Sequence, residues 1–105
     1  MFQLQIVSTD QPAKLVLSGR FSIYEVRHAR GELLAVMPLL DQRDCLVDLR
    51  RVEKLDIAAI QLLLAWEQQT RANNRLLTLL ANDAQSALLR LLGLSRLIAP
   101  SSEAF

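Results

Sequence analysis

Short apolar runs alternate along most of this chain with longer segments of helical periodicity. The runs at 2–6, 13–17, 44–49 and 75–81 predict strands, and the segments after the second, third and fourth runs predict helices. A further short strand near 96–99 is an open alternative. The first two runs are expected to form an antiparallel hairpin, whereas strands separated by helices pair in parallel through right-handed crossovers. We therefore expect one α/β domain of order β-β-α-β-α-β-α, with a mixed β-sheet and helices packed against it.

Local signals predict where the first elements end. Ser18-Gly19 predicts a break after the second strand. Ser22 and Glu25 have the spacing of a capping box, which indicates that the first helix begins there. Pro38 marks the end of this helix or a kink in it.

The two later helices have clearer signals at both ends. The second is predicted over 57–72 and is ended by Asn73-Asn74. The third is expected to be capped by Asn82 or Asp83 and to end at Gly93, where a left-handed residue belongs.

Composition limits the possible partners. The 105 residues are 51% hydrophobic, and 12 Lys and Arg against 11 Asp and Glu leave a net charge of +1, so we expect no nucleic-acid binding. The longest charge-free apolar stretch, 57–66, is about half of the roughly 20 residues that a membrane span needs, so we expect no membrane insertion. One cysteine and no secretory signal favour a cytoplasmic protein. We expect one domain over 1–99 and a tail over 100–105.

Residue types that carry out catalysis or bind metals are few and isolated. The chain has one histidine and one cysteine, and Gly19, Gly31 and Gly93 do not form a phosphate-binding loop. We expect His28 to be an exposed helical residue and Cys45 to be a small buried side chain within a strand. The sequence therefore predicts no enzyme, no metal site and no cofactor.

Asp56 and the basic residues before it are the remaining polar candidates. Asp56 stands where the second helix begins, so an N-cap is the favoured interpretation and a catalytic carboxylate is the alternative. Arg50, Arg51 and Lys54 are predicted to lie in a basic connection. They would be solvated there, steer an acidic partner, or bind an anion beside the helix N-terminus.

The second helix is apolar around most of its circumference. Ile60, Leu62, Leu64 and Ala65 widen its apolar arc beyond the roughly 100° that packing on one sheet requires. Either flanking helices cover the sides of this helix, or part of it docks on another protein. A homodimer through the same face is a further possibility.

The stretch 47–64 resembles the central motif of STAS domains, a family named after sulphate transporters and anti-sigma factor antagonists. In that motif a strand ending like Val47-Asp48-Leu49 is followed by a short loop and by Asp, a hydroxyl residue, a small residue, Gly and an aliphatic residue that open a helix. The segments 17–21 and 88–94 are also similar to parts of the family. The resemblance covers about 15–98 and implies a STAS-like mixed sheet.

The resemblance implies a non-enzymatic module that binds a partner protein through the loop and helix start formed by Asp56, Ile57, Ala58, Ala59 and Ile60. In the family, the residue after the motif Asp is often a Ser or Thr that a partner kinase phosphorylates, which releases the bound partner. Ile57 stands at this position and two alanines follow it, so we expect no phosphorylation there.

Two classes of partner follow from the resemblance. An anti-sigma factor or a sensor-kinase-like protein would make the chain an antagonist-like regulator of bacterial transcription. Alternatively, the chain is a cytoplasmic accessory subunit of a lipid-transporting ABC system and contacts its ATPase subunit, for which the missing hydroxyl is irrelevant. An enzyme or small-molecule binder that uses Asp56 with the basic residues ranks last.

Overall fold

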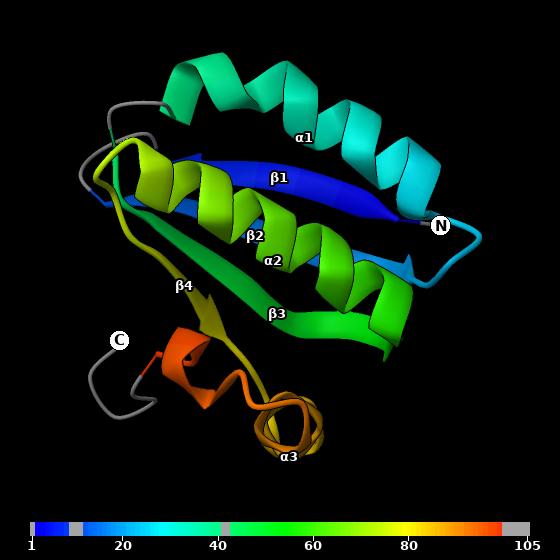
Figure 1. Cartoon of the computed structure of the whole chain (residues 1–105). Coiled ribbons are helices and arrows are strands. Elements are labelled where there is room, and N and C mark those ends of the chain that lie inside the picture. Colours follow the sequence, from blue (N-terminus) through cyan, green and yellow to red (C-terminus); the bar gives the residue numbers. More distant parts are fainter. Residues whose placement is uncertain (1, 9–11, 41–42, 100–105) are drawn as a thin grey trace.

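The computed structural model describes residues 2–8, 12–40 and 43–99 (Figure 1). Its elements are β1 (Gln3–Ser8), β2 (Ala13–Phe21), α1 (Val26–Leu40), β3 (Cys45–Leu55), α2 (Ile57–Ala72), β4 (Leu77–Leu80), α3 (Asp83–Leu91) and the 3₁₀ turn η1 (Ser95–Leu97). This order confirms the predicted succession of strands and helices.

The four strands form one mixed sheet in the order β1-β2-β3-β4. The pair β1–β2 is antiparallel, and the pairs β2–β3 and β3–β4 are parallel, as expected for a hairpin followed by two crossovers. α1 and α2 run over the sheet, whereas α3 and η1 lie at its β4 side (Figure 1). Among the described residues, no helix is both long and apolar enough to cross a bilayer.

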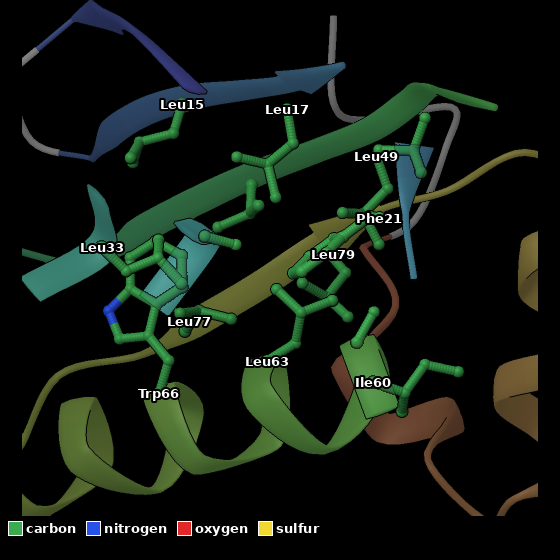
Figure 2. Close-up of a cluster of buried hydrophobic side chains, with 14 of the residues drawn as sticks. Leu15, Leu17, Phe21, Leu33, Leu49, Ile60, Leu63, Trp66, Leu77 and Leu79 are labelled. Carbon is green, nitrogen blue, oxygen red and sulfur yellow. The ribbon is translucent and has the colours of Figure 1, made fainter. Parts of the chain in front are cut away.

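The core lies between the sheet and the two helices α1 and α2. Successive strand residues point to opposite faces, so every second residue of β2, β3 and β4 is directed at the helices. The side chains that meet there include Leu15, Leu17, Leu33, Leu49, Ile60, Leu63, Trp66, Leu77 and Leu79 (Figure 2). Since each large apolar side chain contributes about 1.5–3 kcal/mol on full burial, this layer fixes α2 and the loop before it.

β2 is longer than predicted, and the expected break at Ser18-Gly19 is wrong. The strand continues to Phe21, and its register with β3 shifts on either side of the dipeptide. Gly19 has a φ of 82°. Because glycine reaches this left-handed region without a Cβ clash, the chain absorbs an irregularity there and then resumes pairing.

β3 is also longer than predicted. It extends to Leu55, so the segment 50–54 is strand and not a connection. Arg51 pairs with Ser18 and Lys54 with Arg20 of the lengthened β2. Pairing with a neighbouring strand satisfies the backbone groups of this charged segment, and this tertiary pairing outweighs its low strand propensity.

α1 begins later than the capping-box spacing predicts. The Glu25 carboxylate accepts hydrogen bonds from the Ser22 amide, at 3.1 Å, and from the Ser22 hydroxyl. The hydroxyl thus donates to Glu25 instead of capping the helix, and a turn precedes the helix start at Val26. Pro38 lies inside the last turns of α1.

The remaining boundaries largely agree with the predictions. α2 has the predicted limits, Asn82 caps α3, and Gly93, with φ 74°, ends α3. The possible short strand near 96–99 does not form as a regular strand. The segment folds as η1 followed by a single parallel bridge between Leu79 and Ile98. The predicted tail, 100–105, lies outside the described residues.

Candidate functional site

Asp56 joins two segments at one end of the molecule. Its Oδ1 accepts the Ala59 amide at 3.1 Å and so caps α2, which confirms the predicted N-cap. Its Oδ2 accepts the amide of Ile23, in the loop between β2 and α1, at 2.8 Å. Both oxygens therefore hold backbone in place, and the carboxylate acts as a brace between the two segments.

Large apolar side chains beside Asp56 are exposed to solvent. Ile23 is 64% exposed, Tyr24 84% and Ile57 56%. Ile23 and Tyr24 lie in the loop before α1, and Ile57 is the first residue of α2. The hydrogen bond from Ile23 to Asp56 keeps these segments together. We call Ile23, Tyr24 and Ile57 the loop patch. Exposed apolar side chains grouped in this way are typical of interaction surfaces.

The predicted site residues at the start of α2 divide into accessible and buried ones. Ile57 is exposed and Ala58 is half-buried, whereas Ala59 and Ile60 are buried in the core. Only the first two can contact a partner without displacement of α2. The sequence did not single out Ile23 and Tyr24, in the loop before α1, as site residues. Ile23 continues the apolar spacing of the first helix and so looked like a part of it.

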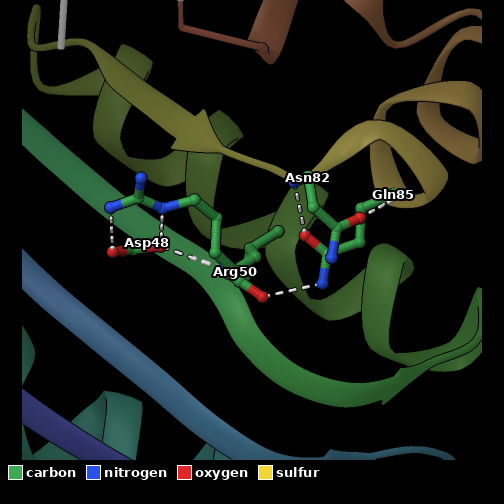
Figure 3. A network of polar contacts seen from close by, with 5 residues as sticks. Asp48, Arg50, Asn82 and Gln85 are labelled. Carbon is green, nitrogen blue, oxygen red and sulfur yellow. Dashed lines mark hydrogen bonds and ion pairs between the residues drawn. The ribbon is translucent and has the colours of Figure 1, made fainter. Parts of the chain in front are cut away.

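The predicted basic residues lie on β3. Arg51 and Lys54 are exposed, and Lys54 pairs in register with Arg20, which is also exposed. Arg50 instead forms a bidentate ion pair with Asp48, with Nε–Oδ1 at 3.1 Å and Nη2–Oδ2 at 3.0 Å (Figure 3). Arg50 therefore differs from Arg51 and Lys54, because its guanidinium is held by Asp48.

Asp48 is a buried carboxylate for which the motif alone predicts no role. Burial raises its pKa, but the hydrogen bonds from the side chain and amide of Arg50 outweigh burial, so the net pKa lies below the ordinary value. The Asp48 carboxylate is therefore ionised at neutral pH and forms an ion pair with the Arg50 guanidinium. Its i, i+2 spacing with Arg50 on one strand is the signal that points to this pair.

Gln85 connects α3 to β3. Its side-chain nitrogen donates to the carbonyl of Leu49 at 2.7 Å and, at 3.4 Å, to that of Val52. Its side-chain oxygen accepts the Asn82 amide, while the Asn82 side chain accepts the Gln85 amide (Figure 3). This capping box therefore also fixes the orientation of α3 relative to the sheet.

Neighbouring elements cover much of both flanks of α2. Leu62 is half-buried and lines a groove of about 250 Å³ against Leu33 and Met37 of α1. Leu64, also half-buried, packs against the core. Glu67 is buried, with Oε2 3.3 Å from Nη1 of Arg96. Flanking elements thus cover Ile60 fully and Leu62 and Leu64 in part, whereas Ala65 stays exposed at the groove.

His28 and Cys45 lie where the sequence predicts. His28 is exposed on α1 and lies 3.1 Å from the carboxylate of Glu32. Cys45 is buried within β3, and burial together with the nearby Asp44 raises the pKa of its thiol to about 11. Within 2–8, 12–40 and 43–99, His, Cys, Asp and Glu side chains form no group of three that could hold a metal ion.

The chain is similar to known proteins over nearly its whole length. The family model described as Mlab, STAS domain, matches residues 4–99. The anti-sigma factor antagonist SpoIIAA in its unphosphorylated form has a TM-score of 0.72 at 18% identity, covering 99% of this chain and 92% of that one. The phosphorylated form of SpoIIAA, described as a Bacillus cell fate determinant, has a TM-score of 0.68 at 18% identity, covering 99% and 96%.

A third structure, the antisigma-factor antagonist STAS domain from Rhodobacter sphaeroides, has a TM-score of 0.56 at 14% identity and covers 83% of this chain and 89% of its own. No curated protein matches the sequence. These structures share the fold of this chain, and the family model spans its strands, helices and motif loop. The chain belongs to the STAS-domain family.

Proposed function

We propose that this chain is a non-enzymatic regulatory module that binds a partner protein through the loop patch. The observation that carries the proposal is the exposure of Ile23, Tyr24 and Ile57 on segments that Asp56 holds together. Apolar and aromatic side chains on a pre-ordered surface supply contact area at little entropic cost, which is what a binding surface requires.

We further propose that Ser or Thr phosphorylation at this loop does not switch the binding. Ile57, Ala58 and Ala59 carry no hydroxyl, and Ser22 is 1% exposed and donates to Glu25. A phosphate would bring about −1.5 to −2 charges into the contact, and these residues offer it no attachment point. Ile57 adds an apolar contact at the same place.

The preferred partner is an anti-sigma factor or a sensor-kinase-like protein. Support comes from the shared fold with SpoIIAA and with the Rhodobacter antagonist. Arg20, Arg51 and Lys54 are exposed near this end of the sheet and would favour an acidic border on the partner. Screening limits that attraction to about 8 Å at physiological salt.

A second candidate is an accessory subunit of a lipid-transporting ABC system, with its ATPase subunit as the partner. The exposed Ile57 favours it, because a permanent subunit contact needs an apolar surface and no phosphorylation switch. Both candidates use the loop patch. They differ in the protein that binds there.

The test compares purified wild-type and Ile57→Glu proteins as baits in the source lysate, with bound proteins identified by mass spectrometry. We expect wild type to retain an anti-sigma factor or kinase-like protein, and Ile57→Glu to lose it. Leu76→Glu is the matched control, since Leu76 is 67% exposed at the opposite end of the parallel strands. ABC-transporter subunits on the wild-type bait would select the second candidate.

Affinity measured with the recovered partner completes the test. A glutamate in a desolvated apolar contact is expected to weaken binding by about 2 kcal/mol, or about 30-fold. Equal affinity of wild type and Ile57→Glu, with matching thermal melts, would exclude the loop patch as the binding surface.

A further inference from the structure

The side of α3 that faces the protein is mostly polar. Its buried residues are Gln85, Ser86 and Leu89, of which only Leu89 is apolar. The hydrogen bond from Gln85 to the carbonyl of Leu49 holds this side against β3. An amphipathic helix normally directs its apolar side to the core, whereas α3 directs mainly polar side chains there and keeps several apolar ones at the surface.

Several apolar side chains of α3 lie at the surface or at its edge. Ala84, Ala87, Leu88 and Leu91 follow one another at i, i+3, i+4 and i+7 and form a continuous stripe, which we call the α3 stripe. Leu91 is 82% exposed and both alanines are exposed, whereas Leu88 is half-buried and also packs against the core. α3 lies at the β4 side of the sheet, away from α1 (Figure 1).

We propose that the α3 stripe is the contact surface of a homodimer in which the two α3 helices pack antiparallel about a twofold axis. The order of residue sizes along the stripe carries this proposal. When Ala87 lies opposite Leu88 of the second copy, Ala84 lies opposite Leu91. Every small side chain then faces a large one, and a twofold contact is complementary to itself in just this way.

Charges beside the stripe favour the same arrangement. Asp83 is in the first turn of α3 and Arg90 in the last, and at about 100° per residue both fall on the same flank of the stripe. Antiparallel packing brings Asp83 of each copy to Arg90 of the other. Parallel packing would bring like charges together, so the charges select a second copy in antiparallel orientation.

A groove beside the helix enlarges the contact. It has a volume of about 240 Å³, and its walls include Val52 and Leu55 of β3 together with Ala84 and Leu88. Leu91 of the second copy, which lies opposite Ala84, is placed to enter it. A contact based on nine helical residues and one groove is smaller than the roughly 800 Å² per partner of stable complexes, so we expect a weak dimer with a dissociation constant of about 100 µM.

Sedimentation velocity from about 10 µM to about 1 mM tests the proposal. We expect wild type to pass from monomer to dimer with rising concentration, and Leu91→Arg to raise the dissociation constant at least about 10-fold. Leu76→Arg, at a similarly exposed leucine remote from α3, is the control and should dimerise like wild type. A chain that stays monomeric throughout would overturn the proposal and leave the stripe to a different protein.

A charge reversal tests the orientation. Asp83→Arg and Arg90→Asp should each weaken the dimer, and the double variant should restore it because the opposite charges meet again. Thermal melts of each variant separate this effect from the cost of placing a cation at the start of α3. A double variant that dimerises more weakly than both single variants would refute the antiparallel arrangement.

Discussion

Replacement of Asp56 by alanine should destabilise the protein through two separable hydrogen bonds. Loss of the cap to the Ala59 amide costs about 1 kcal/mol. Loss of the bond from the Ile23 amide costs about another 1–1.5 kcal/mol, because the acceptor is charged. The expected decrease in the free energy of unfolding is therefore about 2–2.5 kcal/mol.

Urea unfolding followed by circular dichroism measures this decrease. With a slope of about 1–1.5 kcal/mol per M for a domain of this size, the midpoint should fall by about 2 M. Asp56→Asn has one acceptor oxygen in place of two, so we expect about half of the loss. Asp83→Ala, at an exposed acid in the first turn of α3, should cost less than about 0.5 kcal/mol and serves as the control.

Asp56→Ala is also expected to weaken partner binding. Once the Ile23 amide is released, the loop before α1 no longer has a fixed position relative to Ile57, and the partner must order it. If Asp56→Ala unfolds within about 0.5 kcal/mol of wild type, or if Asp56→Asn matches wild type, the two bonds do not have the proposed role.

Three further predictions concern buried polar groups. The folded-state pKa of Asp48 is lowered, so its contribution to stability is present above the ordinary carboxyl pKa of about 3.9 and is lost as the pH falls through the lower folded value. Asp48→Asn should therefore flatten the acid limb of the stability curve, and an unchanged limb would contradict this. The thiol of Cys45, with its pKa raised to about 11, should react with a disulfide reagent at pH 8 only as fast as the protein unfolds; rapid labelling of native protein would show that it is accessible. Gln85→Ala leaves the Leu49 carbonyl without its buried donor and should cost about 2 kcal/mol in urea unfolding, whereas the exposed Gln61→Ala should cost almost nothing.

The limits of α2 could be predicted because the signals are local. Asp56 supplies the cap, and Asn74, with φ 60°, adopts the left-handed conformation that asparagine tolerates after a helix. The extra lengths of β2 and β3 could not be predicted in this way. They depend on pairing between residues that lie more than 30 positions apart, such as Gly19 with Val52.

The candidate site was predictable only in part, for a similar reason. The motif points to Asp56 and Ile57, which are adjacent in sequence. Ile23 joins them through a hydrogen bond that spans 33 positions, and in the sequence it looks like one more apolar residue of a helix. The inward direction of the polar side of α3 likewise follows from a distant contact, that of Gln85 with Leu49.

The single bridge beyond β4 has a consequence for solubility. β4 is an edge strand of four residues, and the free backbone groups of an uncovered edge strand can pair with strands of other molecules. The Ala99 amide donates to the Leu79 carbonyl at 2.7 Å. The ion pair of Arg96 with Glu67 also holds the segment 95–99 along this edge. The segment 95–99 therefore covers part of the free edge of β4 and should reduce edge-to-edge aggregation. A chain truncated before Ser95 would expose this edge.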